Sequence, residues 1–135
     1  MIKSIVYRLI LVLIIISFIS CEKHEDVLPG LKGTWIGSYD NNDTIIFKSS
    51  SLKGLFEFNR GYETRNGHLL PKSGSGLYFY DISDDNINIV SGVSSSGIGT
   101  KVYFKLNESE KRFQIGIFAA GFVTDLYIVE FQKIK

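Results

Sequence analysis

The chain has 135 residues, of which 15 are Lys or Arg and 14 are Asp or Glu, and 44% of its residues are hydrophobic. A chain of this length can build one domain around one core. The near-neutral charge, with no basic cluster, gives no support for nucleic-acid binding, and a single cysteine excludes an internal disulfide.

The first twenty residues differ in character from the rest of the chain. Lys3 and Arg8 supply a basic start, and a predominantly apolar segment follows at residues 9–19. A membrane-spanning helix needs about 20 apolar residues, so this segment is too short to span and is typical of the core of a signal peptide. The sequence therefore predicts a signal peptide over residues 1–20.

A cysteine stands directly after this segment, in the sequence Phe18-Ile19-Ser20-Cys21. This resembles the lipobox of bacterial lipoproteins, although Phe18 stands where that family more often has Leu. The resemblance implies that Cys21 is acylated and becomes the first residue of the mature protein, which would then be held at a membrane without a spanning helix. The alternative is an ordinary secretory signal followed by a coincidental cysteine.

Residues 21–30 are short, charged and closed by Pro29-Gly30, so they predict a tether. Their acidic residues, Glu22, Glu25 and Asp26, resemble the surface-export signals that follow the cysteine in lipoproteins of the Bacteroidota. The resemblance implies an outer-membrane lipoprotein of the cell envelope, exposed either at the surface or on the periplasmic side.

The rest of the chain, residues 31–135, alternates apolar and polar side chains in short segments separated by turn residues, with no convincing helical stripe. We expect an all-β domain with eight strands, at residues 33–40, 44–48, 54–59, 76–83, 86–91, 100–106, 112–118 and 126–133.

Charged residues in these strands should point to water, which assigns a face to their neighbours. The inward set is predicted to be Trp35, Tyr39, Ile45, Phe47, Phe56, Phe58, Tyr78, Tyr80, Ile82, Ile87, Ile89, Val102, Phe104, Leu106, Phe113, Ile115, Ile117, Tyr127, Val129 and Phe131. The apolar residues left facing outward are Leu77, Phe79, Leu126 and Ile128.

Gly33-Thr34-Trp35 opens the first strand, and seven more strands follow without helices. This is similar to the lipocalins and the wider group of lipocalin-like proteins, whose first strand carries a G-x-W motif. The resemblance implies an eight-stranded antiparallel up-and-down barrel, with Trp35 stacked under a basic residue at one end. Lys133 and Arg112 are both candidates for that residue, and a β-sandwich is the alternative fold.

Catalytic and metal-binding patterns are not apparent. His24 and His68 lie far apart without neighbouring ligand residues, so the sequence predicts no metal site, no catalytic residues and no cofactor. The Ser- and Gly-rich residues 92–99 match neither a nucleophile elbow nor a phosphate-binding loop, and we expect a flexible loop there.

The longest connection, residues 60–75, carries Asn66-Gly67, a strong two-residue turn signal. It predicts a protruding hairpin or an ordered flap. Such long connections are often functional, although a tolerated surface insertion is the alternative.

Two hypotheses for function follow. In the first, the barrel binds a small apolar or amphipathic ligand, with Trp35, Tyr39, Tyr78, Tyr80 and Tyr127 as lining residues and with hydroxyl partners supplied by the ligand. In the second, aromatic side chains fill the barrel, and a structural or interaction lipoprotein acts on a protein partner through the 60–75 hairpin and the outer apolar face. A large enclosed void would favour the first hypothesis, and a packed interior would favour the second. The oligomeric state is left open.

Overall fold

The computed structural model describes residues 26–39, 42–119 and 127–134, and within these ranges every regular element is a β-strand. The ten strands are β1 (Gly33–Gly37), β2 (Thr44–Phe47), β3 (Lys53–Asn59), β4 (Tyr62–Arg65), β5 (His68–Pro71), β6 (Gly76–Ser83), β7 (Asn86–Ser91), β8 (Thr100–Asn107), β9 (Arg112–Gly116) and β10 (Ile128–Lys133).

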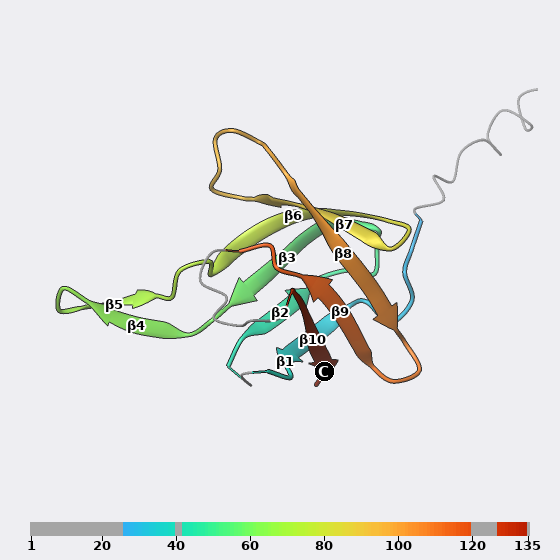
Figure 1. Cartoon of the computed structure of the whole chain (residues 1–135), viewed down its shortest axis with the longest axis horizontal. Helices are drawn as coiled ribbons and strands as arrows, with labels where there is room; N and C mark the ends of the chain where they lie inside the picture. The colour runs from blue at the N-terminus through green and yellow to red at the C-terminus, as the bar shows by residue number, and fades with distance from the viewer. Residues whose placement is uncertain (1–25, 40–41, 120–126, 135) are drawn as a thin grey trace, which may run out of the picture.

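Eight of these strands form one closed antiparallel barrel (Figure 1). Around the barrel each strand pairs with the strands before and after it in the chain, except that β6 follows β3 and the last strand returns to the first. The closing pair sets Trp35 opposite Lys133 and Gly37 opposite Phe131. The prediction of an all-β, eight-stranded up-and-down barrel is confirmed, and the β-sandwich is not formed.

The strands β4 and β5 leave the barrel between β3 and β6 and form a two-stranded hairpin that projects to one side (Figure 1). Asn66 and Gly67 connect them, with φ angles of 52° and 81°. Positive φ at both central residues is the backbone of a type I′ turn, whose twist matches that of the paired strands. The predicted protruding hairpin is therefore confirmed.

The alternation of faces along the strands also agrees with the sequence pattern. Fifteen of the twenty predicted inward side chains are buried: Trp35, Ile45, Phe47, Phe56, Phe58, Tyr78, Tyr80, Ile82, Ile87, Ile89, Phe104, Phe113, Ile115, Val129 and Phe131. Four more are half-buried: Tyr39, Val102, Leu106 and Ile117. The outward assignment of Leu77, Phe79 and Ile128 is confirmed by their exposure, whereas Leu126 lies outside the described residues.

The inward assignment of Tyr127 is wrong, because its side chain is 90% exposed. The last strand begins at Ile128, one residue later, so the alternation that governs the strand does not fix the direction of Tyr127. Three other predicted strands were too long: β1 ends at Gly37, β2 ends at Phe47 and β9 ends at Gly116. Ser38 and Tyr39 form a turn beyond β1.

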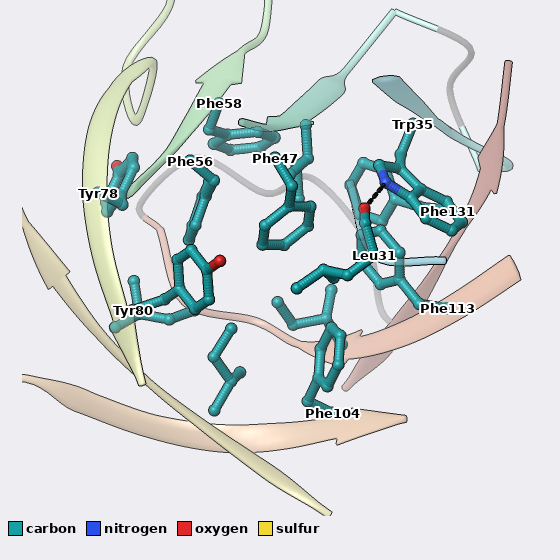
Figure 2. Packing of buried hydrophobic residues seen from close by; sticks show 14 of the residues in the cluster. Leu31, Trp35, Phe47, Phe56, Phe58, Tyr78, Tyr80, Phe104, Phe113 and Phe131 are labelled. Atoms are coloured by element: carbon teal, nitrogen blue, oxygen red, sulfur yellow. Dashed lines mark hydrogen bonds between the residues drawn. The ribbon is translucent and has the colours of Figure 1, made fainter. Parts of the chain in front are cut away.

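A continuous column of aromatic rings occupies the middle of the barrel. Trp35, Phe113, Phe47, Phe56 and Phe118 follow one another with ring centroids 4.9, 5.9, 5.4 and 5.6 Å apart. Figure 2 shows the labelled rings pointing inward from the surrounding strands. Contacts at these spacings, mostly edge-to-face or tilted, are the favoured arrangement of aromatic pairs. The described side chains therefore pack together along the barrel interior.

Candidate functional site

The inward tyrosines predicted to line a ligand site already have protein partners. Their hydroxyls donate hydrogen bonds as follows: Tyr39 to Asp43 Oδ2 at 2.5 Å, Tyr78 to the Gly74 carbonyl at 2.6 Å, and Tyr80 to the Ser51 carbonyl at 2.8 Å. Across the described parts of the chain, every buried side-chain nitrogen and oxygen has a hydrogen-bond partner. No such atom is thus left for a ligand to satisfy.

The fifth predicted lining residue, Tyr127, is not brought to this interior, as its exposure shows. Trp35 closes one end of the barrel: its indole Nε1 donates to the Leu31 carbonyl at 2.9 Å. The Lys133 ammonium lies 5.2 Å from the centre of the Trp35 ring and donates to the Gly30 carbonyl at 2.7 Å. Lys133 is therefore the basic residue over the tryptophan.

The other candidate for that position, Arg112, is occupied elsewhere. Its NH1 lies 3.3 Å from Glu130 Oε1 on the outside of the barrel. Both strands of this pair, β9 and β10, are neighbours, so the pair is an ordinary cross-strand contact.

A buried ion pair lies near the opposite end of the barrel, close to Phe58. The Arg60 Nε lies 3.2 Å from Asp43 Oδ2 and 3.3 Å from Oδ1, and the two side chains are only 8% and 1% exposed. The guanidinium also lies over the Phe58 ring, 6.0 Å from its centre. Salt screens a charge pair this deeply buried much less than it screens an exposed pair.

The same arginine fastens the base of the hairpin to the barrel. Arg60 NH1 donates to the Ser73 carbonyl at 2.9 Å, and the Arg60 backbone N–H donates to Ser75 Oγ at 3.1 Å. These contacts fix the two chain segments that lead into and out of the hairpin. Burial raises the pKa of the nearby Tyr78 phenol above its ordinary value of 10.0, an effect that the positive charge of Arg60 partly offsets.

Sequence reasoning missed Asp43 and Arg60. A signal for both was present, because the strand alternation extends past the strand ends: Arg60 follows Phe56 and Phe58 at spacing two, and Asp43 precedes Ile45 in the same way. They were not predicted to be buried, because charged side chains were assumed to point to water. That assumption fails where two opposite charges point inward together.

Four cavities lie along the surface of the described barrel and hairpin. The largest of them, about 620 Å³, flanks the Lys53–Asp81 ion pair, and another of about 350 Å³ lies beside Trp35 and Lys133. A cavity of about 210 Å³ crosses the outer faces of β8, β9 and β10. Trp35 and Phe113, two rings of the column, each line one of these cavities, whereas Phe47, Phe56 and Phe118 line none of the four.

The remaining cavity, about 380 Å³, lies between the hairpin and the barrel wall. Tyr62 and Pro71 line it from the hairpin, and Leu77 lines it from β6. Apolar residues continue from it in both directions. We call the exposed set the apolar docking surface: Leu55, Leu77 and Phe79 on the barrel, with Tyr62 and Leu69 on the hairpin.

The strand register explains why these residues gather. Leu55 of β3 is directly opposite Phe79 of β6, and Leu77 shares the face of Phe79 because it lies two residues before it. On the hairpin, Leu69 is opposite Thr64, which shares its face with Tyr62. Each of the five apolar side chains is at least 40% exposed. Clustered exposure of this kind often marks a contact site.

Other site chemistry is sparse in the described ranges. No three His, Cys, Asp or Glu side chains gather there into a group that could hold a metal ion. The same residues include no helix of the length and hydropathy needed to cross a membrane. Cys21, the predicted lipidation site, and the predicted signal peptide lie outside the described residues.

Comparison with known protein families, with curated proteins and with solved structures finds no match to this chain. The site must therefore be interpreted from its own geometry.

Proposed function

We propose that this chain is a membrane-tethered, non-catalytic interaction protein, acylated at Cys21, whose barrel displays a hairpin and an apolar docking surface to a protein partner. Of the two hypotheses from the sequence, this is the one with a solid core. The observation that carries it is the continuous aromatic column through the barrel, from Trp35 to Phe118.

Several features support an external site over an internal one. The tyrosine hydroxyls expected to meet a ligand donate instead to Asp43 and to backbone carbonyls. Apolar side chains that the core does not use lie together outside, next to a groove of about 380 Å³. The arginine contacts hold the base of the hairpin against the barrel, which limits the entropy lost there when a partner binds.

The contact is tested by placing a photo-crosslinking amino acid at Leu69 or Leu77 in the full chain, in intact cells. We expect both positions to yield one discrete cross-linked protein species. Ile134, which is also apolar and exposed but lies at the opposite end of the barrel, where its backbone N–H donates to the Thr34 carbonyl at 2.9 Å, is the control and should yield none. Equal yields at all three positions, or no product at Leu69 and Leu77, would overturn the proposal.

The internal alternative is tested on the same material. Native mass spectrometry of the protein purified from its host should show the mass of the acylated chain without an added small molecule. A stoichiometric apolar ligand that survives purification would favour the first hypothesis instead.

The tether is tested separately. Cys21→Ala removes the proposed acylation site, so the anchoring energy of about 0.8 kcal/mol per buried CH₂ is lost with the fatty chains. We expect the variant to lose metabolic labelling with a fatty-acid analogue and to be released from the membrane fraction. Labelling that persists in the variant would contradict acylation at Cys21.

A further inference from the structure

The outer edge of the hairpin strand β4 is unpaired among the described residues, since its sheet contains only β4 and β5. The Lys72 backbone N–H donates to the Gly61 carbonyl at 2.9 Å, just outside the two strands. Antiparallel ladders alternate hydrogen-bonded and non-hydrogen-bonded pairs. Counting from that bond, Tyr62 and Thr64 direct their backbone N–H and C=O groups away from β5.

The outer edge of β5 is protected by comparison. Pro71 has no backbone N–H to donate, and its carbonyl accepts a hydrogen bond from Arg65 NH2 at 3.1 Å. Proline on an edge prevents strand addition, because it cannot donate a hydrogen bond to an added strand. The open edge of the hairpin is therefore that of β4.

The side chains of β4 are complementary to a second copy of themselves. Glu63 and Arg65 lie on either side of Thr64 and form an ion pair of 3.1 Å within the chain. If two β4 strands meet antiparallel and centred on Thr64, Glu63 of each copy comes opposite Arg65 of the other. Opposite charges directly across a strand pair stabilise it, and like charges destabilise it.

We infer that the partner is a second copy of this chain, joined through β4 to β4 in an antiparallel, two-fold symmetric, four-stranded sheet centred on Thr64. This inference rests on the proposed function and names its partner. A two-fold contact uses the same surface on both copies, which the exchange of Glu63 and Arg65 satisfies. Strand addition to an exposed edge is a common mode of recognition.

The shape of the molecule leaves room for this pairing. The hairpin projects beyond the barrel, and the described N-terminal segment beginning at Asp26 leaves the barrel on the other side (Figure 1). Two overlapped hairpins therefore place their barrels at opposite ends of the shared sheet. A contact of four residues per strand is smaller than a standard stable interface. Pairing is accordingly weak in dilute solution and is favoured by the high local concentration of copies on a membrane.

The first experiment measures self-association of the full chain in detergent, by sedimentation velocity over a series of concentrations. Wild type should shift reversibly from monomer to dimer. The charge variants E63R and R65E should each remain monomeric, because each sets like charges opposite one another across the two-fold axis. An equimolar mixture of the two should dimerise again, because both arginines of the E63R strand then face glutamates of the R65E strand.

Mixing separates this contact from the ion pair inside the hairpin. Each variant has like charges within its own chain whether alone or mixed, so only a contact between copies can restore association. A mixture that associates no better than either variant alone overturns the inference.

The second experiment tests whether the backbone edge of β4 makes the contact. Thr64→Pro removes the outward-facing N–H at the centre of the proposed contact, whereas Thr64→Val keeps this N–H and removes only the side-chain hydroxyl. Proline is tolerated at this position, because its N–H does not bond within the hairpin. We expect T64P to abolish dimerisation and T64V to preserve it, with hairpin NMR signals kept in both. Dimerisation that persists in T64P, or that is lost in T64V, overturns the assignment to β4.

The two proposals fail separately. If wild type remains monomeric at every concentration but position 69 cross-links to a different protein, self-pairing is overturned and the proposed function stands. If wild type is monomeric and positions 69 and 77 give no cross-link, both are overturned.

Discussion

The buried ion pair between Asp43 and Arg60 allows a sharp test of how burial controls the energy of a salt bridge. Its closest N···O distance is 3.2 Å, while an exposed pair, Lys53 with Asp81, has almost the same distance of 3.1 Å. The side-chain exposures differ widely, at 8% and 1% for the first pair and 75% and 46% for the second. Geometry is therefore held nearly constant while solvation changes.

Asp43→Asn keeps the shape of the side chain but removes its charge. Arg60 is then left buried without its counter-ion, and Tyr39 loses the carboxylate oxygen that accepts its hydroxyl. At an effective dielectric constant of about 20, opposite charges about 4 Å apart attract by roughly 4 kcal/mol. Breaking a buried pair from one side costs about 3–5 kcal/mol. We expect a loss of that size in the free energy of unfolding.

The matched control is Asp81→Asn, for which an exposed pair predicts a loss of about 1 kcal/mol or less. Denaturant unfolding of the full chain can be followed by fluorescence, since Trp35 is the single tryptophan and is completely buried. The double variant Asp43→Asn with Arg60→Met should recover part of the loss, because no unpaired charge remains buried. Equal losses for the two single variants would refute the reasoning.

Three further predictions concern the tyrosines and the turn. Tyr80→Phe removes the hydroxyl that donates to the Ser51 carbonyl, so the free energy of unfolding should fall by about 1 kcal/mol in denaturant titrations. An unchanged free energy of unfolding would show that this hydrogen bond does not stabilise the fold. Gly67→Ala puts a side chain at φ 81°, with no steric contact within 4 Å, so the cost is conformational, about 1 kcal/mol. That loss should appear in NMR as hairpin fraying, with the barrel transition unchanged, and a shift of the barrel transition would contradict it. The raised pKa of Tyr78 favours the neutral phenol in the folded state. The phenol therefore contributes its full stabilisation below pH 10, the ordinary pKa that applies to the unfolded chain, and loses it as the pH rises through the higher pKa of the folded state. Tyr78→Phe should flatten this part of the curve of unfolding free energy against pH. A curve identical to that of wild type would rule the effect out.

The barrel was predictable because its physical determinants are local. Side chains alternate with period two, and turn residues separate the strands, so neighbours in sequence become neighbours in the sheet. The turn at Asn66-Gly67 was predictable for the same reason, since the two residues favour positive φ. These features need no knowledge of distant contacts.

What the sequence did not settle depends on contacts between distant segments. Lys133 and Arg112 were equal candidates to cover Trp35, and only the register of β10 against its neighbours separates them. Tyr127 follows the apolar alternation and lies one residue outside its strand, as Asp43 and Arg60 do, yet it is exposed while they are buried, so alternation alone does not fix the direction of a residue beyond a strand end. Whether the tyrosine hydroxyls would find protein acceptors was also undecidable, because the acceptors come from other turns.

The unused edge of β4 belongs to the same category. The sequence predicted the hairpin but not which of its sides would be blocked, because that depends on Arg65 reaching the carbonyl of Pro71. The alternation of apolar and polar residues assigns side chains to the two faces of a strand. It does not predict which strand edge keeps its backbone N–H and C=O groups unpaired.

The closing pair of β1 and β10 has a consequence for the order of folding. It joins residues 33–37 to residues 128–133, so the barrel has two open edges until its last strand is in place. Contacts between such distant segments are slow to form, because a long loop must close before any of them is made. Closure of the barrel should therefore be the last step of folding and should require β10. Removal of this strand should leave a chain with exposed strand edges that aggregates, rather than a smaller barrel.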